Sequence, residues 1–391
     1  MFTPDFEKYN FVKIKKIKLK KLGLEILWDD GSKTSHLAKN LREFSIDPQT
    51  THPITRESLL LPLDIPDDFY IKNVTDNKNG FLKIQWSEKL FKEEKDFSIF
   101  HTGWLYHTGN NNENKIYGAL KEKLWKSSDF KKIKIIDGKK IFDDDKEFLH
   151  FLSNILVFGV SLVKNLENKP KTIELFTNLI GTVRGSNFGK FFDVKIKKNA
   201  DSNAYTSHEL KPHNDLATRE YIPGVQILFC LKNSVKGGKS TLCDGYAIAK
   251  EINQKNKDVF KLLSNYQIDF ANKSDTSDYR YSSPLFFHNK QGKLNEVRWT
   301  NWLRSPLRGS LSKMEKFYNA QKLAYKYSDN KKFKIEIKLN PGELLCFDNR
   351  RVLHGRTSFN SNTGERWLRG CYMEREEIFS AIRVLQRKIN K

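Results

Sequence analysis

The chain has 391 residues, 38% hydrophobic and 13% aromatic, which is enough apolar side chain for a sizeable core in one large domain and a smaller one. Lys and Arg outnumber Asp and Glu by 69 to 47, so the formal net charge is +22. No apolar run reaches the roughly 18 residues that would span a bilayer, so no membrane-embedded segment is expected.

The high positive charge raises the question of a nucleic-acid partner. The lysines are spread along the whole length, from Lys13 to Lys388, and no basic stripe is interleaved with aromatic residues. We therefore expect a generally basic surface that attracts anions, and no nucleic-acid partner. Nucleic-acid binding is kept as a remote alternative.

The cysteines and the start of the chain point to a reducing compartment. The four cysteines are scattered and contain no Cys-x-x-Cys pair; they are Cys230, Cys243, Cys346 and Cys371. The first residues are acidic and lack the apolar core of a signal peptide. We expect reduced, buried thiols and a cytoplasmic location.

The first 108 residues are predicted to form a small β-rich domain. Leu24 to Gly31 alternates apolar and polar residues and ends in an Asp-Gly turn, and Phe81 to Trp86 repeats the alternation. A third strand is expected from Phe97 to Leu105. The polar stretch from Gly109 to Lys115 is the predicted boundary.

The remainder, residues 116–391, is predicted to be mostly β with helices. Apolar residues at helical spacing predict a helix over Asp144 to Val157, and Ile155 to Val163 is interpreted as a buried strand. Further helices are expected over Lys171 to Gly181 and Leu311 to Ser328, the last with a capping box of Ser312 and Glu315; these two residues stand three apart at its start. Many short strands with long insertions favour a double-stranded β-helix, or jelly-roll, over a doubly wound sheet.

A metal site is suggested by His213-Asn214-Asp215. Side chains two apart on an extended strand point the same way, so this imidazole and carboxylate can hold one ion. Two histidines and one carboxylate on one face of an ion are typical of non-haem Fe(II) oxygenases. About one His-x-acid triplet is expected by chance among 9 His and 47 acidic residues, so the pair needs support. A second cluster supplies it, because the strand Glu343 to Phe347 is followed by His354-Gly355.

These motifs belong to a longer ordered series between Phe148 and Glu376. Its members are Asn187-Phe188-Gly189, Ala204-Tyr205-Thr206, His213-Asn214-Asp215, Pro223-Gly224-Val225-Gln226, Gly237-Gly238, Asp244-Gly245, Phe347-Asp348-Asn349 through Arg356, and Arg366-x-Leu368-x-Gly370-x-Tyr372. In this series the chain resembles the Fe(II)/2-oxoglutarate dioxygenases of the taurine dioxygenase superfamily. Within it, the chain is similar to γ-butyrobetaine dioxygenase and its trimethyllysine and bacterial relatives.

The resemblance implies a role for each matching residue. Fe(II) would be held by His213, Asp215 and His354, and the far carboxylate of 2-oxoglutarate by Arg366, whose planar guanidinium suits a two-point contact. Leu228 would line the cosubstrate pocket. The residues implied for the substrate are Phe188, Phe192, Tyr205 and Tyr372 around a trimethylammonium group, and Asn301 at its acid group. Asn203 is shifted against the family's second asparagine.

The implied activity is hydroxylation of a small trimethylammonium acid with Fe(II), 2-oxoglutarate and O₂, with γ-butyrobetaine favoured and carnitine as product. A trimethylammonium alkylphosphonate or trimethyllysine is the alternative substrate, and a non-catalytic metal-binding jelly-roll is a remote alternative. A homodimer is a possible assembly that the sequence does not decide. Relatives often bind Zn²⁺ through three cysteines and a histidine in the first domain, but no cysteine precedes Cys230, so no zinc is expected.

Overall fold

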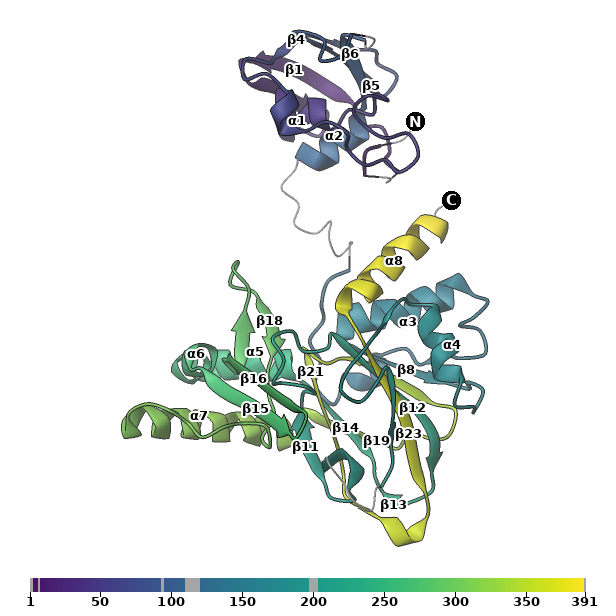
Figure 1. Cartoon of the computed structure of the whole chain (residues 1–391), viewed down its shortest axis with the longest axis vertical. Helices are drawn as coiled ribbons and strands as arrows, with labels where there is room; N and C mark the ends of the chain where they lie inside the picture. The colour runs from purple at the N-terminus through teal and green to yellow at the C-terminus, as the bar shows by residue number, and fades with distance from the viewer. Residues whose placement is uncertain (1–2, 6–7, 93–94, 110–119, 197–202, 390–391) are drawn as a thin grey trace. The chain divides into compact units, whose positions relative to one another are not determined.

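The computed structural model describes residues 3–5, 8–92, 95–109, 120–196 and 203–389 (Figure 1). The chain divides into two compact units, Met1–Ile116 and Tyr117–Lys391. Most of the stretch proposed as the boundary, Gly109 to Lys115, lies outside the described residues. Within the described ranges, no helix is both long and apolar enough to cross a membrane.

In its described residues, the first unit contains two three-stranded antiparallel sheets, in the orders β1-β2-β3 and β4-β5-β6. Its strands are β1 (Ile14–Lys20), β2 (Gly23–Trp28), β3 (Lys33–Leu37), β4 (Ile71–Asp76), β5 (Phe81–Trp86) and β6 (Phe97–His101), and its helices are α1 (Ala38–Glu43) and α2 (Thr102–Gly109). The expected third strand therefore ends at His101, and the helix α2 follows. The predicted β-rich character of this unit is confirmed.

Two buried tryptophans lie at the centre of the first unit. Trp28 donates from its indole nitrogen to Thr34 Oγ1 at 2.9 Å, and Trp86 donates to Ser98 Oγ at 2.9 Å. Thr34 Oγ1 also lies 3.0 Å from His36 Nε2, and burial lowers the pKa of His36 to about 4. The core is thus filled by apolar rings whose polar atoms find hydroxyl partners.

The second unit is a double-stranded β-helix, which confirms the predicted fold. Its major sheet has the order β10-β23-β12-β20-β8-β7, with β9 beside β23, and its minor sheet has the order β11-β21-β14-β19. The major strands are β7 (Ile136–Asp137), β8 (Val160–Lys164), β9 (Val183–Arg184), β10 (Phe191–Val194), β12 (Val225–Asn233), β20 (Leu344–Asp348) and β23 (Arg366–Met373). The minor strands are β11 (Leu210–His213), β14 (Ser240–Asp244), β19 (Lys334–Ile337) and β21 (Val352–Arg356).

Among the described residues, three two-stranded ribbons and six α-helices complete this unit. The ribbons are β13 (Lys236–Gly237) with β22 (Phe359–Asn360), β15 (Ile268–Ser274) with β16 (Ser277–Ser283), and β17 (Phe286–His288) with β18 (Leu294–Val297). The helices are α3 (Asp145–Phe158), α4 (Thr172–Asn178), α5 (Gly245–Lys255), α6 (Lys257–Asn265), α7 (Leu311–Asp329) and α8 (Arg375–Ile389).

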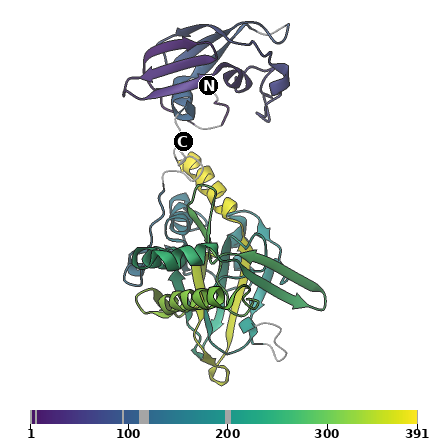
Figure 2. The same cartoon turned by 90° about the vertical axis from the view of Figure 1, so that its left-hand side faces the viewer.

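Alternation along β12 sorts its side chains between two layers. Val225, Ile227 and Phe229 pack in one cluster with residues of α3, α4 and α8. Leu228 belongs to the inner cluster, where Leu242 of the minor sheet also packs. The outer face of the minor sheet is covered by α5, α6 and α7, seen together in Figure 2. The space between the two sheets is therefore reached by the inward residues of β12.

Two local predictions are wrong. The apolar run expected to be a strand from Ile155 continues α3 as far as Phe158; Gly159, at φ +73°, then ends the helix in the left-handed conformation. The N-cap of α7 is Ser310, which accepts from Lys313 N at 3.4 Å, in place of the expected Ser312.

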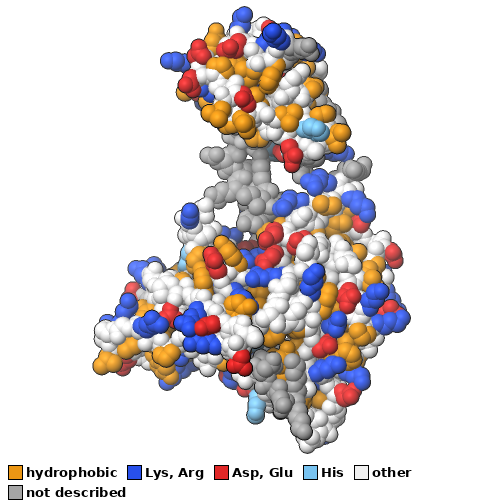
Figure 3. Space-filling view, viewed as in Figure 1, with side chains coloured by type: hydrophobic (Ala, Val, Ile, Leu, Met, Phe, Trp, Pro, Cys, Tyr) orange, Lys and Arg blue, Asp and Glu red, His pale blue; other side chains and the backbone are white. Residues whose placement is uncertain are grey.

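The positive charge is dispersed. On the face shown in Figure 3, Lys and Arg side chains are spread out, with Asp and Glu side chains among them. No single basic stripe is visible on that face, as the scatter of lysines along the sequence predicts.

The first unit is predicted to be free of zinc. A structural zinc site needs four ligands, usually thiolates and imidazoles, and no cysteine precedes Cys230. Within the described residues, the single cluster of three or more possible metal ligands lies in the second unit. Elemental analysis of untagged protein should give substoichiometric zinc. One tightly held zinc per chain would contradict this prediction.

Candidate metal centre and cavity

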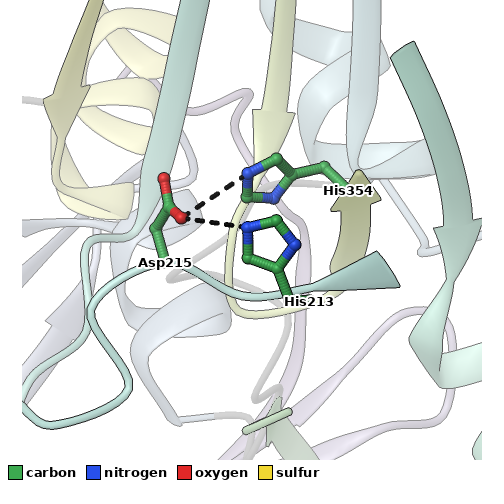
Figure 4. A group of neighbouring side chains, drawn as sticks. All are labelled: His213, Asp215 and His354. Atoms are coloured by element: carbon green, nitrogen blue, oxygen red, sulfur yellow. Dashed lines mark ion pairs between the residues drawn. The ribbon is translucent and has the colours of Figure 1, made fainter. Parts of the chain in front are cut away.

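The register between β11 and β21 brings two histidines together. His213 is the last residue of β11 and lies opposite His354 of β21. Asp215 follows two residues after His213 and turns back towards both rings (Figure 4). Its Oδ1 lies 3.3 Å from His213 Nε2 and 3.6 Å from His354 Nε2. The sequence prediction of these three residues as one group therefore matches their placement.

The two imidazoles present their Nε2 atoms to the same carboxylate oxygen. The ring of His213 is oriented by a contact of 2.8 Å between its Nδ1 and Lys211 O, in which the protonated Nδ1 donates and the Nε2 lone pair is left for an ion. Burial, followed by the nearby His213, lowers the pKa of His354 to about 3. Burial alone would raise the pKa of Asp215, but His354, His213 and Tyr372 together hold it well below its usual range. The group thus offers two ring nitrogens and one carboxylate oxygen.

A hydrogen-bond network fixes the backbone that carries Asp215. Asp215 N donates to Asn349 Oδ1 at 2.9 Å, and Asn349 Nδ2 donates back to Asp215 O at 3.1 Å. Asn214 in turn exchanges hydrogen bonds of 2.8 Å with the backbone of Trp299. Leu216 directly after Asp215 has φ +58°, a strained conformation for a branched residue. These bonds stabilise a turn that would otherwise be unfavourable.

Tyr372 connects the metal group to the major sheet. Its hydroxyl donates to Asp215 Oδ2 at 2.7 Å, which leaves Oδ1 facing the two histidines. Carboxylate ligands in metal sites are commonly oriented by such a partner. Metal–ligand bonds of about 2.0–2.2 Å place neighbouring ligand atoms about 3 Å apart, so the observed spacings fit one ion with its other positions open.

A cavity of about 700 Å³ lies over this group. Gln226 and Leu228 of β12 reach it from the major sheet, together with Arg366 and Tyr372 of β23. Leu228 was predicted to line the cosubstrate pocket, and it does line this cavity. The size is within the range of small-molecule sites.

Arg366 is a buried cation without a counter-charge. It is 9% exposed, its Nε has no hydrogen-bond partner, and no carboxylate in the described part of the chain pairs with it. Burial lowers its pKa to about 10, so it stays protonated near neutral pH. Gly238 leaves room for it, because a Cβ there would lie 3.3 Å from Arg366 Cδ and Nε. A desolvated guanidinium of this kind needs an anionic partner, and a carboxylate entering the cavity would supply one.

Aromatic rings form another part of the wall. The rings of Phe192 and Tyr372 are 5.1 Å apart, and Phe188 lies 6.1 Å from Phe192. Tyr205 is buried and also lines the cavity. Gly370 makes room for this wall, since a Cβ there would lie 2.8 Å from the Phe192 ring. The four rings predicted to surround a cation therefore face one cavity.

One predicted site residue, Asn301, is not among the residues that line the cavity. It is exposed, whereas its neighbour Trp302 lines the wall and packs edge-on against His213 at 4.4 Å. Sequence reasoning also gave no role to several further wall residues, which are Gln226, Arg356 and the hairpin residues Asn272, Lys273, Ser274, Thr276 and Ser277. Gln226 stands two residues before Leu228 on the same strand, so the alternation of side chains could have placed it on the same face.

Replacement of Tyr372 by phenylalanine tests the role of its hydroxyl apart from the role of its ring. Tyr372→Phe keeps the ring in the wall but removes the hydrogen bond to Asp215. Loss of such a partner typically weakens metal binding about 10–100-fold. Anaerobic Fe(II) titration should show weaker binding in this range, with a quaternary ammonium ligand still bound. Unchanged metal affinity would contradict the orienting role.

Comparisons with known proteins agree with this geometry. The family described as "Taurine catabolism dioxygenase TauD, TfdA family" matches residues 126–372. A γ-butyrobetaine dioxygenase of Pseudomonas sp. (strain AK-1) is 33% identical over 369 residues, covering 93% of this chain and 94% of that protein. The γ-butyrobetaine dioxygenase of Pongo abelii is 26% identical over 94% of this chain and 95% of its own. A trimethyllysine dioxygenase of Meyerozyma guilliermondii is 24% identical over 93% of each chain. The chain therefore belongs to the TauD/TfdA family of dioxygenases, as a member similar to γ-butyrobetaine dioxygenase.

Proposed function

We propose that the enzyme hydroxylates γ-butyrobetaine to carnitine. The observation that carries this proposal is the wall of four aromatic rings in the same cavity as the His213, Asp215 and His354 group. A trimethylammonium group has no N–H to donate, so it is best held by aromatic faces. In the described part of the wall, Asp215 is the only carboxylate, and it is committed to the metal and to Tyr372.

The enzyme is a 2-oxoglutarate-dependent dioxygenase that uses Fe(II) and O₂. With Fe(II) bound, one oxygen atom of O₂ enters the substrate as a hydroxyl group and the other enters succinate. 2-Oxoglutarate gives up two electrons on oxidation to succinate and CO₂, the C–H bond gives up two more, and these four electrons together reduce O₂. The protein supplies binding, orientation and a restricted environment for this chemistry.

Each part of the cavity wall has a distinct task in this proposal. Arg366 binds the far carboxylate of 2-oxoglutarate and so sets the direction in which its keto acid end reaches the metal. Phe188, Phe192 and Tyr205 hold the trimethylammonium group, and Tyr372 contributes its ring to them while its hydroxyl orients Asp215. The substrate is thereby held at its cationic end, and the chain that follows it passes the metal.

Trimethyllysine and a trimethylammonium alkylphosphonate are the alternative substrates, since both present the same cationic group. They differ at the other end, where Asn301 stays a predicted contact. The four cysteines are free and buried, as a reducing cytoplasm would favour.

A panel of γ-butyrobetaine, trimethyllysine and a trimethylammonium alkylphosphonate tests the substrate assignment. For each compound, the succinate released is compared with the hydroxylated product formed. A salt-sensitive complex with DNA or RNA, without turnover of any of the three, would favour the nucleic-acid alternative.

A neutral isostere tests the aromatic wall. In 5,5-dimethylhexanoate a tert-butyl group replaces trimethylammonium, which keeps the shape and removes the charge. Cation–π attraction contributes roughly 1–2 kcal/mol, so the isostere should bind about tenfold worse or more. Phe188→Leu, at a position away from the metal ligands, should reduce this difference in affinity, because it weakens binding of the charged ligand more than binding of the isostere. Equal binding of both ligands to the unaltered enzyme would exclude a cation cage.

Replacement of Arg366 by lysine tests the cosubstrate site. An ammonium group cannot reproduce the two-point contact of a guanidinium, so Arg366→Lys should raise the apparent KM for 2-oxoglutarate about tenfold or more. Arg369→Lys is the matched control, because Arg369 lies on the same strand but faces Asp193 and Glu174 outside the cavity. A similar KM in the two variants would contradict the role of Arg366.

A further inference from the structure

Arg356 is a second buried cation in the cavity wall, and it has no part in the steps above. It is 4% exposed, and no carboxylate in the described ranges pairs with it. Its guanidinium donates instead to three backbone carbonyls. The distances are 3.0 Å to Ala204 O, 2.7 Å to Thr206 O and 2.8 Å to His208 O.

The three carbonyls belong to one short segment, residues 203–208, which carries a ring of the aromatic wall. Tyr205 lies between two of the residues that Arg356 contacts. The segment is also tied to the chain beyond β21, since Phe359 N donates to Ser207 O at 3.2 Å. Arg356 is therefore a side chain that holds the backbone on both sides of Tyr205.

Arg356 is at the same time a neighbour of Arg366. The two guanidinium carbons lie 4.9 Å and 5.7 Å from the centre of the same ring, that of Phe359. The charge of Arg366 adds to burial in lowering the pKa of Arg356, and no carboxylate in the described ranges pairs with either guanidinium. A carboxylate bound at Arg366 would offset that repulsion.

We propose that Arg356 is a positioning residue that couples the two ligands: a carboxylate bound at Arg366 stabilises Arg356 in its contacts with residues 203–208 and so holds Tyr205 in place for the quaternary ammonium group. The identity of the two ligands rests on the function proposed above. Coupling between two sites is reciprocal. Each ligand therefore strengthens binding of the other.

The first test needs no substrate. Hydrogen–deuterium exchange of peptides covering 203–208 is measured in the anaerobic Fe(II) enzyme, with and without 2-oxoglutarate. The cosubstrate should slow exchange in this segment of the unaltered enzyme. Arg356→Lys should abolish that slowing, since one ammonium group keeps the charge but cannot reach three carbonyls.

The second test measures coupling directly. The Kd for γ-butyrobetaine is determined anaerobically by calorimetry, with and without saturating 2-oxoglutarate. The unaltered enzyme should bind about fivefold or more tighter with the cosubstrate, within the usual range of coupling. Arg356→Lys should reduce this ratio to near one, while binding 2-oxoglutarate alone within about threefold of the unaltered enzyme, because the positive charge remains.

Arg350→Lys is the matched control. Arg350 donates from Nε and Nη2 to Ile222 O at 3.0 Å and 2.9 Å, but it does not line the cavity. This variant should keep both the coupling ratio and the slowed exchange. Loss of both effects in Arg350→Lys, or their retention in Arg356→Lys, would overturn the proposal. Slowed exchange with no γ-butyrobetaine binding would overturn the proposed substrate and leave the response of the segment to the cosubstrate standing.

Discussion

The pairing of His213 with His354 across β11 and β21 is the constraint on which the site depends. An antiparallel register fixes which side chains lie opposite each other, and a slip of one strand by one residue would turn its histidine away from the cavity. Here the register places two Nε2 atoms beside the same Asp215 oxygen. The hydrogen bonds of Asn214 and Asn349 hold the turn after His213, so the three ligand atoms converge before any ion arrives. Such preorganisation lowers the cost of binding a metal.

The major sheet supplies specificity by the same alternation. Residues 366, 368, 370 and 372 of β23 share one face, and the strand places a cation at one end and an aromatic ring at the other. Gly370, between them, has no side chain, and the Phe192 ring uses that space. A buried cation without an acid partner is unfavourable in the free enzyme. Arg366 therefore binds an incoming carboxylate strongly, because the carboxylate supplies the missing ion-pair partner.

Sequence patterns predicted the elements and residues whose signal is local. Asp144 caps α3 by accepting from Lys146 N and Glu147 N, and the apolar spacing after it predicted the helix. A short apolar run is compatible with either strand or helix, so the end of α3 was mistaken for a strand although Gly159 marked it. Trp302 and Arg356 are residues whose roles the sequence did not predict. Their roles come from contacts with His213 and with residues 203–208, and no spacing in the sequence encodes such distant contacts.

The central claim is that one cavity holds the cosubstrate at Arg366, the metal at His213, Asp215 and His354, and the trimethylammonium group among the aromatic rings. An anaerobic crystal structure with Fe(II), 2-oxoglutarate and γ-butyrobetaine tests it most directly. The account predicts a carboxylate in two-point contact with Arg366 and the ammonium group enclosed by Phe188, Phe192, Tyr205 and Tyr372. A substrate bound in the reverse direction, with its carboxylate among the rings, would contradict it.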